Sequence, residues 1–282
     1  MKCIVTGGRG FLGSAIAKHL EGQGHIVIAT DKDDYDLDRR DVEELAKMFQ
    51  SVDEFYHCAG IVGTSELERC PHVAVEQNIL NTLKMFQAAK DVPRVFFPSK
   101  PISSHNIYTL TKKFIEDTMY LFPNVKILRC FNIFGPGQAM VPIKRMLPAF
   151  SLRAMKGLPL QVYGDGSQVV DMLYAKDAAE GIVRFIRSDI KEILDFGGHP
   201  MTVREVAEDI NTFFKNGADI ESLPMRPGED PSKATKASSR FFTLFPMALT
   251  KWKTALWETL EWYQSRSEDE ITQALELYKI QT

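Results

Sequence analysis

The sequence predicts an α/β protein in which a doubly wound parallel sheet is joined to a smaller, mixed α/β C-terminal lobe. Three observations carry this prediction. Short apolar strands alternate with segments of helical periodicity through the first half of the chain. A glycine-rich turn joins the first strand to the first helix, and the alternation becomes irregular beyond residues 135–137.

The glycine turn follows a short apolar strand, Cys3–Val5, and precedes a segment of helical periodicity over residues 11–20. Its glycines fit two spacings, one that starts at Gly8 and one that starts at Gly7, and both share Gly10 and Gly13. Glycine permits positive φ and a close approach of the backbone to phosphate. The unpaired N–H groups of the first helical turn favour an anion there. The pattern therefore predicts a site for the pyrophosphate of a dinucleotide.

An acidic residue ends the second strand. Residues 24–31 form that strand, and Asp31 comes eighteen residues after Gly13. This is close to the ~20 residues at which a carboxylate binds the ribose hydroxyls of a dinucleotide.

Further strand and helix units continue the first lobe. Val75, Leu80, Leu83 and Phe86 are available for burial on one of its helices. We expect helix 42–49, strand 55–60 with a small-residue turn, helix 73–89, strand 94–97, helix 108–121 and strand 125–131.

The later elements are a mixture. We expect helix 142–156, strand 160–163, turn 164–166, helix 175–186, a capping-box start at 202–205 and helix 251–263 with Leu256, Leu260 and Tyr263 on one stripe. The simplest division has a dinucleotide-binding domain from 1–136 and 171–196 and a substrate-binding lobe from 137–170 and 197–282. A cleft between them would hold a substrate beside the cofactor.

The composition of the chain limits the classes of binding partner and the locations that we expect. The net charge of −3 gives no electrostatic reason to expect nucleic acid or an anionic membrane. No apolar run approaches the ~18–20 residues of a membrane span. Because the N-terminus leads directly into a strand, we expect no signal peptide. The four cysteines form no metal-like pair, and we expect no metal site and a reducing, cytoplasmic location.

The chemistry-bearing pair is Tyr108 and Lys112, four residues apart on one helical face. Tyrosine has a reference pKa of about 10, and a nearby ammonium group favours the phenolate, which can then act in proton transfer. The alternative is an exposed helical pair without function. The position of the pair between the fourth and fifth strands, at the carboxyl edge of a parallel sheet, favours catalysis.

Several motifs together resemble the extended short-chain dehydrogenase/reductase family, in its branch of NAD-dependent nucleotide-sugar epimerases and dehydratases. The resemblance covers nearly the whole chain and implies a Rossmann-like fold. It rests on residues 6–13, Asp31, Asn78, Tyr108 with Lys112, and residues 129–136, 162–168 and 226–228.

The resemblance implies roles for individual residues. Tyr108 would transfer the proton, and Lys112 would hold the nicotinamide ribose. An acid at Asp31 favours NAD over NADP. The cofactor set comprises Gly7, Gly10, Phe11, Leu12, Gly13, Asp31, Asp36, Leu37, Ala59, Gly60, Asn78, Tyr108, Lys112 and Phe131, and the substrate diphosphate set comprises Asn132 and Arg226. For Asn78, an amide that only packs helices is an equal alternative.

The implied mechanism is transient oxidation. Tyr108 takes a proton from a sugar hydroxyl while hydride moves to NAD, and the keto sugar turns over before hydride returns to its other face. The expected substrate is a nucleotide sugar, with a UDP-sugar favoured.

The chain departs from this pattern in the short segment before Tyr108. Relatives carry a Ser or Thr after the fourth strand, whereas this chain has Lys100 there. Lys100 could act as an electrophile, or a hydroxyl of Ser99, Ser103 or Ser104 could replace the missing one. Relatives also place an Arg where this chain has Val170, and their dehydratases use an Asp-Glu pair that this segment lacks.

The leading hypothesis is therefore an epimerase acting at C4 of a UDP-sugar. The alternatives are an NAD(P)H-dependent reductase of a nucleotide-linked keto sugar and an NAD-binding sensor or scaffold with weakened catalysis. A homodimer is expected because helices 78–90 and 108–121 are apolar over more than one face, with Leu110, Phe114, Ile115, Met119 and Leu121 exceeding a single stripe.

Overall fold

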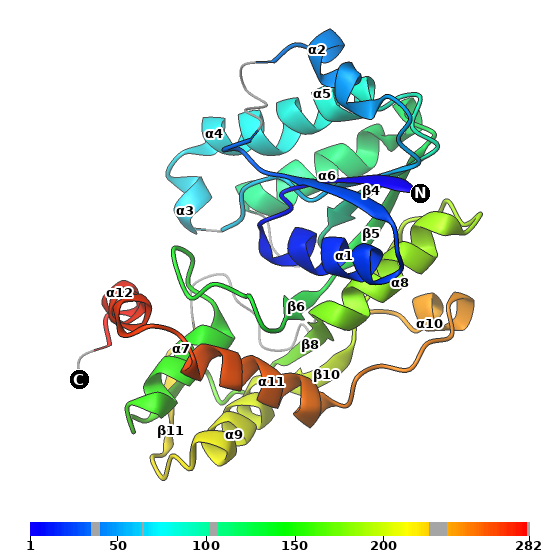
Figure 1. Ribbon diagram of the computed structural model, residues 1–282. Helices are drawn as coiled ribbons and strands as arrows, with labels where there is room; N and C mark the ends of the chain where they lie inside the picture. The colour runs from blue at the N-terminus through cyan, green and yellow to red at the C-terminus, as the bar shows by residue number, and fades with distance from the viewer. Residues whose placement is uncertain (35–39, 64, 102–105, 226–235, 281–282) are drawn as a thin grey trace. The chain divides into compact units, whose positions relative to one another are not determined.

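The computed structural model describes residues 1–34, 40–63, 65–101, 106–225 and 236–280 (Figure 1). The chain divides into two compact units. Unit 1 comprises Met1–Cys130, Ala175–Phe196 and Ser238–Met247, and unit 2 comprises Phe131–Tyr174, Gly197–Ala237 and Ala248–Thr282. Compared with the division expected from the sequence, residues 131–136 and 171–174 fall in unit 2 and residues 238–247 fall in unit 1.

Unit 1 contains a six-stranded parallel sheet in the order β2-β1-β3-β4-β5-β9. Its strands are β1 Lys2–Thr6, β2 Ile26–Thr30, β3 Glu54–His57, β4 Arg94–Ser99, β5 Val125–Cys130 and β9 Leu194–Phe196. The predicted parallel α/β fold is confirmed. The strand order reverses between β1 and β3, and open α/β sheets bind ligands at the carboxyl ends of strands at such a switch point.

Helices cover both faces of this sheet (Figure 1). Helices α1 and α8 pack against each other on one face, and α2, α5 and α6 enclose a core with apolar side chains of the other face. The helical segments of unit 1 are α1 Phe11–Gly22, α2 Val42–Ala46, η2 Lys47–Phe49, α3 Ser65–Glu68, α4 Pro71–Val75, η3 Glu76–Leu80, α5 Asn81–Ala88, α6 Ile107–Thr118, η4 Met119–Leu121, α8 Ala175–Arg187 and α10 Arg240–Leu244.

The helix expected over 73–89 contains a π-helical segment, η3, between α4 and α5. The wider turn changes which side chains face the sheet. Val75 is 37% exposed and Leu80 is 52% exposed, so the expectation that they are buried was wrong, whereas Phe86 is buried as expected. A strict 3.6-residue period cannot reveal such a segment.

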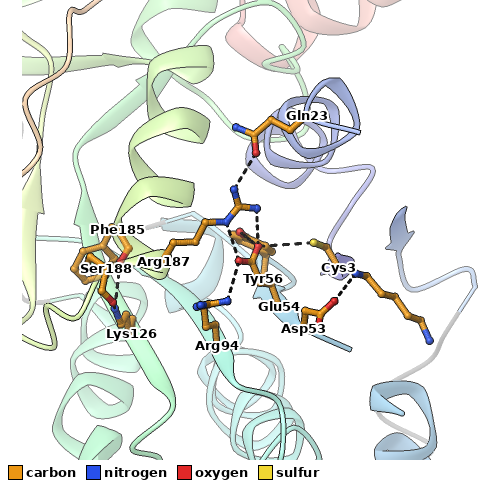
Figure 2. A network of polar contacts seen from close by, with 11 residues as sticks. Cys3, Gln23, Asp53, Glu54, Tyr56, Arg94, Lys126, Phe185, Arg187 and Ser188 are labelled. Carbon is orange, nitrogen blue, oxygen red and sulfur yellow. Dashed lines mark hydrogen bonds and ion pairs between the residues drawn. The ribbon is translucent and has the colours of Figure 1, made fainter. Parts of the chain in front are cut away.

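A buried ion pair anchors α8 to the amino edge of the sheet (Figure 2). Glu54 begins β3 and is fully buried. Arg187, the last residue of α8, donates from Nε to Oε1 of Glu54 at 2.8 Å and from Nη2 to Oε2 at 3.0 Å. The Tyr56 hydroxyl donates to Oε2 at 2.8 Å, and Arg187 also donates to the Oε1 of Gln23, just after α1. This network ties the ends of two helices to one strand.

Unit 2 is built on a three-stranded sheet, β10-β8-β6, and a parallel pair, β11-β7. The stripe of Leu256, Leu260 and Tyr263 on α11 is buried in its core, as expected. Its elements are β6 Asn132–Phe134, α7 Met146–Met155, β7 Leu160–Tyr163, β8 Val169–Tyr174, β10 His199–Thr202, α9 Val203–Phe214, β11 Ile220–Leu223, α11 Trp252–Gln264 and α12 Glu268–Tyr278.

Some expectations for unit 2 need correction. The capping box at the start of α9 is confirmed, because Thr202 and Glu205 bond reciprocally. The helix expected from residue 142 begins only at Met146, and strands β6, β8, β10 and β11 were not expected. Within the described residues, no helix has the length and apolar character needed to cross a bilayer.

Candidate functional site

The glycine turn between β1 and α1 is closed by three tight backbone contacts. Gly7 has a φ of +66°, and a Cβ there would lie 2.8 Å from the amide nitrogen of Ala59. A Cβ on Gly13 would lie 2.1 Å from the carbonyl oxygen of Gly7, and one on Gly10 would lie 3.0 Å from it. The glycines are therefore required by the packing of the turn against α1 and against the backbone after β3.

The turn leaves the first helical N–H groups without intrahelical acceptors. Gly10 is the N-cap and supplies no side-chain cap, and the first bond within the helix runs from the N–H of Ser14 to the carbonyl of Gly10. The N–H groups of Phe11, Leu12 and Gly13 lie before that bond. A turn built mostly of glycine, whose first helical N–H groups have no intrahelical acceptor, fits a pyrophosphate, the group predicted to bind here.

Asp31, just after β2, lies beside this turn. Its Oδ2 accepts the backbone N–H of Arg9 at 3.2 Å, and its Oδ1 accepts the N–H of Lys32 at 2.9 Å. The carboxylate predicted to bind a ribose is thus adjacent to the turn predicted to bind the pyrophosphate. Asp36 and Leu37, predicted near the adenine, lie outside the described residues.

Asn78 holds the loop that follows Ala59 and Gly60. Its Oδ1 accepts the N–H of Ile61 at 2.9 Å, and its Nδ2 donates to the carbonyl of Ile61 at 2.9 Å and to Oγ1 of Thr111 at 3.3 Å. A Cβ on Gly60 would lie 2.9 Å from that Oδ1. These bonds agree with a packing amide, the alternative kept open from the sequence. A direct contact of Asn78 with the cofactor stays a prediction.

Tyr108 and Lys112 lie in the first turns of α6, which begins with a capping box at Asn106. Lys112 is only 7% exposed. Its Nζ lies 4.2 Å from the centroid of the Phe97 ring and 5.9 Å from the centroid of the Tyr108 ring. Burial lowers the pKa of Lys112 to about 8, so the ammonium is still largely protonated at neutral pH. The sequence left open that Tyr108 and Lys112 are an exposed pair without function. The burial of Lys112 disagrees with that alternative.

Two thiols lie close to this ammonium. Cys58 follows β3 and Cys130 ends β5, and burial raises the pKa of each thiol to about 12. They are neutral at physiological pH, so they do not compensate the charge of Lys112. Both are free thiols.

The segment after β4 carries the residues proposed to replace the usual hydroxyl. Ser99 donates from Oγ to Oε1 of Glu116 at 2.6 Å, and Arg129 donates to both oxygens of that carboxylate. The Ser99 hydroxyl is therefore already hydrogen-bonded to the carboxylate of the Glu116–Arg129 ion pair. Lys100 is partly buried, which lowers its pKa. Ser103 and Ser104 lie outside the described residues.

Two predicted site residues begin unit 2. Phe131, predicted to line the nicotinamide pocket, is 8% exposed. Asn132, predicted to bind the substrate diphosphate, begins β6 and donates from Nδ2 to the carbonyl of Asp171 at 3.3 Å. Val170 packs against the apolar core of this unit. Arg226 lies outside the described residues.

Sequence reasoning missed two buried polar residues of unit 1. His57 lies between Thr6 Oγ1 at 2.7 Å and Thr82 Oγ1 at 3.2 Å, and burial lowers its pKa to about 3, so it is neutral. Thr111 connects Asn78 to α6, since its Oγ1 donates to the carbonyl of Tyr108 at 2.8 Å. No periodic signal marks either residue. Among the residues with described positions, no group of three His, Cys, Asp or Glu side chains could hold a metal ion.

Comparison with solved structures finds the same fold. UDP-glucose 4-epimerase from Thermotoga maritima superimposes with a TM-score of 0.83 at 19% identity, over 94% of this chain and 99% of that one. UDP-glucuronic acid 4-epimerase from Bacillus cereus, solved with UDP-glucuronic acid and NAD, gives a TM-score of 0.80 at 21% identity, over 94% and 99%.

Sequence comparison finds relatives with another named activity. UDP-N-acetyl-α-D-glucosaminuronate decarboxylase from Bacillus cytotoxicus is 27% identical, over 95% of this chain and 99% of the relative. UDP-glucuronic acid decarboxylase 1 from Arabidopsis thaliana is 27% identical over 83% of this chain and 62% of its own length. The model of the NAD dependent epimerase/dehydratase family matches residues 3–197. With the glycine turn and α6 placed as described, the chain belongs to the NAD-dependent epimerase/dehydratase family.

Proposed function

We propose that this protein is an NAD-dependent epimerase that inverts C4 of a UDP-sugar through a transient keto sugar. The observation that carries the proposal is the buried ammonium of Lys112, 5.9 Å from the Tyr108 ring centroid, on a helix between β4 and β5. A fixed positive charge beside a phenol favours the phenolate, which can accept a proton from a sugar hydroxyl.

The proposed roles follow from this pair. Tyr108 takes the proton of the C4 hydroxyl and later returns it, and Lys112 keeps the phenolate charge balanced. Bound NAD supplies the hydride acceptor for the oxidation and the donor for the reduction. The turn at Gly7, Gly10 and Gly13 would hold the pyrophosphate, and Asp31 would hold the adenosine ribose. Unit 1 is thus the proposed dinucleotide-binding domain.

Unit 2 is the proposed substrate-binding lobe, in which Asn132 and Arg226 would bind the substrate diphosphate. For the hydroxyl that relatives place after β4, we propose Lys100 or Ser103. Ser99 is the weaker choice because Glu116 already accepts its hydroxyl proton. A cation at Lys100 could polarise the reacting oxygen without itself transferring a proton.

The test is incubation of the purified chain and NAD with a panel of UDP-, GDP- and dTDP-sugars, with products resolved by chromatography. We expect interconversion of a UDP-sugar with its C4 epimer and no net formation of NADH. Tyr108→Phe should abolish turnover while leaving NAD binding in place. If no sugar of the panel is converted, or if Tyr108→Phe turns over normally, the proposal fails.

A second candidate function is decarboxylation of a nucleotide-linked uronic acid. It is favoured by the curated relatives, since a 27% identical protein covering 95% of this chain is named as such a decarboxylase. Both reactions would begin with oxidation at C4, so the same residues serve both proposals. Released carbon dioxide and a nucleotide-linked product one carbon shorter would identify the decarboxylase.

We also propose a homodimer formed through η3, α5 and α6. Leu80, Leu110, Phe114 and Leu121 are each between 46% and 56% exposed, which is unusual for apolar side chains on adjacent helices. Phe114→Glu should convert a dimer to a monomer in light scattering at micromolar concentration. A monomeric wild-type protein would refute this proposal.

The four cysteines are free thiols, which supports a reducing, cytoplasmic location.

A further inference from the structure

Burial lowers the pKa of three lysines in unit 1, and two of them have visible compensation. Lys126 donates from Nζ to the backbone carbonyls of Phe185 and Ser188 (Figure 2). The Nζ of Lys112 lies over the Phe97 ring. The third is Lys100, whose lowered pKa has desolvation as its cause.

Lys100 differs from the other two because nothing compensates its charge. Across the described part of the chain, its ammonium makes no hydrogen bond, ion pair or contact with a ring face. Transfer of a charged group out of water is unfavourable unless a partner replaces the lost hydration. A desolvated lysine without a partner in the protein therefore suits an anion from outside it.

The position of Lys100 indicates where that anion would come from. Lys100 directly follows β4, at the carboxyl edge of the sheet, and Tyr108 lies in the first turn of α6, which comes later in the chain. The pyrophosphate site proposed above lies after β1, two strand positions away in the order β1-β3-β4, or about 10 Å. The anion at Lys100 is therefore a different group from the pyrophosphate at the glycine turn.

No described carboxylate neutralises this part of the edge. Glu116, the acid reached from neighbouring Ser99, is already paired with Arg129 at 2.6 Å. Asp31 follows β2, which lies three strand positions from β4, or about 14 Å, and it accepts backbone N–H groups. The charge of Lys112 would be balanced by the Tyr108 phenolate in the proposed mechanism. Lys100 therefore stays unpaired among the described residues.

We propose that Lys100 binds the carboxylate of an acidic sugar, so that the substrate is a nucleotide-linked hexuronate rather than a neutral hexose. This inference rests on the proposed function, because it assigns the substrate of the same site. Of the two roles open to Lys100, it chooses binding of the carboxylate over polarisation of the reacting oxygen. A carboxylate on the sugar would accept charge-assisted hydrogen bonds from the Lys100 ammonium. These bonds would offset the free energy that the ammonium loses by desolvation. A neutral hexose with a hydroxymethyl group in that place would leave the charge uncompensated.

The size of the preference follows from such bonds. A hydrogen bond to a charged group contributes enough to change an affinity by about 10- to 150-fold. We therefore expect UDP-glucuronic acid to bind about 10- to 150-fold more tightly than UDP-glucose, since the two differ only at this carbon.

The experiment measures dissociation constants of both nucleotide sugars, by calorimetry, for the full chain loaded with NAD. Lys100→Met keeps an unbranched side chain of nearly the same length and removes its charge, so the preference for UDP-glucuronic acid should collapse to within about threefold. Lys100→Arg keeps the charge and should retain most of the preference. Lys90→Met, an exposed lysine beyond α5, is the matched control and should bind both sugars as the wild type does.

The outcomes separate this inference from the proposed function. Equal affinities of the wild type for both sugars, or a Lys100→Met variant that keeps the preference, overturn the role of Lys100 but leave the nucleotide-sugar proposal standing. A Lys100→Met variant that loses turnover of both sugars equally, at unchanged affinity, also overturns it and assigns Lys100 to catalysis alone. If neither sugar binds, both proposals fail.

Discussion

Substitution of Gly13 by alanine should separate cofactor binding from the stability of the rest of the fold. The added Cβ would lie 2.1 Å from the carbonyl oxygen of Gly7, whereas ordinary contacts begin near 3.4 Å. The turn must therefore open by about 1.3 Å. Forcing such an overpacked contact costs about 1–3 kcal/mol of folding free energy. It also displaces the N–H groups proposed to bind the pyrophosphate, so NAD affinity should fall about 100-fold.

The same helix supplies the control. Gly22 is the last residue of α1, and a Cβ there would meet nothing within 4 Å. Gly22→Ala should therefore raise stability by about 0.5–1 kcal/mol, because alanine loses less backbone entropy than glycine, and should leave NAD affinity unchanged. Calorimetric titration with NAD and urea denaturation measure both quantities. A Gly13→Ala variant with wild-type NAD affinity and wild-type stability would refute this account of the turn.

Two further predictions concern buried charge. Lys112→Met should raise stability at pH 7 by up to about 3 kcal/mol, because the pKa of Lys112 falls from 10.5 to about 8 on burial. This penalty is complete below pH 8 and disappears as the pH rises from about 8 to 10.5, so wild-type stability should gain in that window and the variant should lack this gain; urea denaturation at several pH values checks both. Arg187→Met should cost about 3 kcal/mol, because buried Glu54 loses two charge-assisted hydrogen bonds and keeps the Tyr56 hydroxyl and Arg94, whose Nη1 lies 3.7 Å from Oε1. Arg184→Met removes an exposed i,i+4 pair with Glu180 and a hydrogen bond to the carbonyl of Pro246, and should cost about 1 kcal/mol or less. Equal melting temperatures of the two arginine variants would contradict the role of the network.

The first lobe was predictable because its signals are local. A strand, a glycine turn and a helix N-terminus fit within thirteen residues. Each β-α unit that follows is predicted by the spacing of its own apolar residues. Lys112 was recognised from its spacing to Tyr108. The depth of its burial was not, since it depends on Phe97 from the preceding strand.

The rest depends on contacts between distant segments. Glu54 and Arg187 are 133 residues apart in the sequence, and no local sequence pattern predicts that they form an ion pair. Strands β8 and β10 pair with each other, but α8 and β9, which belong to unit 1, separate them in the sequence. Their pairing is therefore not visible in the local sequence pattern. The π-helical segment η3 interrupts the 3.6-residue period, and Leu80 at its end is 52% exposed. A periodicity argument detects the helix but not this interruption.

The two edges of the parallel sheet treat buried charge in opposite ways, and this contrast bears on where the chemistry lies. At the amino edge, Glu54 receives Arg187 and the Tyr56 hydroxyl, so its charge is fully compensated within the protein. At the carboxyl edge, Lys100 and Lys112 are desolvated, and no described carboxylate pairs with either. Stability alone would favour neutral side chains at both lysine positions, because an uncompensated buried charge is unfavourable. The cost is consistent with a site whose missing negative charges are brought by its phenolate and its ligands. The stability gain expected of Lys112→Met and the carboxylate preference expected of Lys100 thus share one cause, a desolvated ammonium that pairs with no described carboxylate.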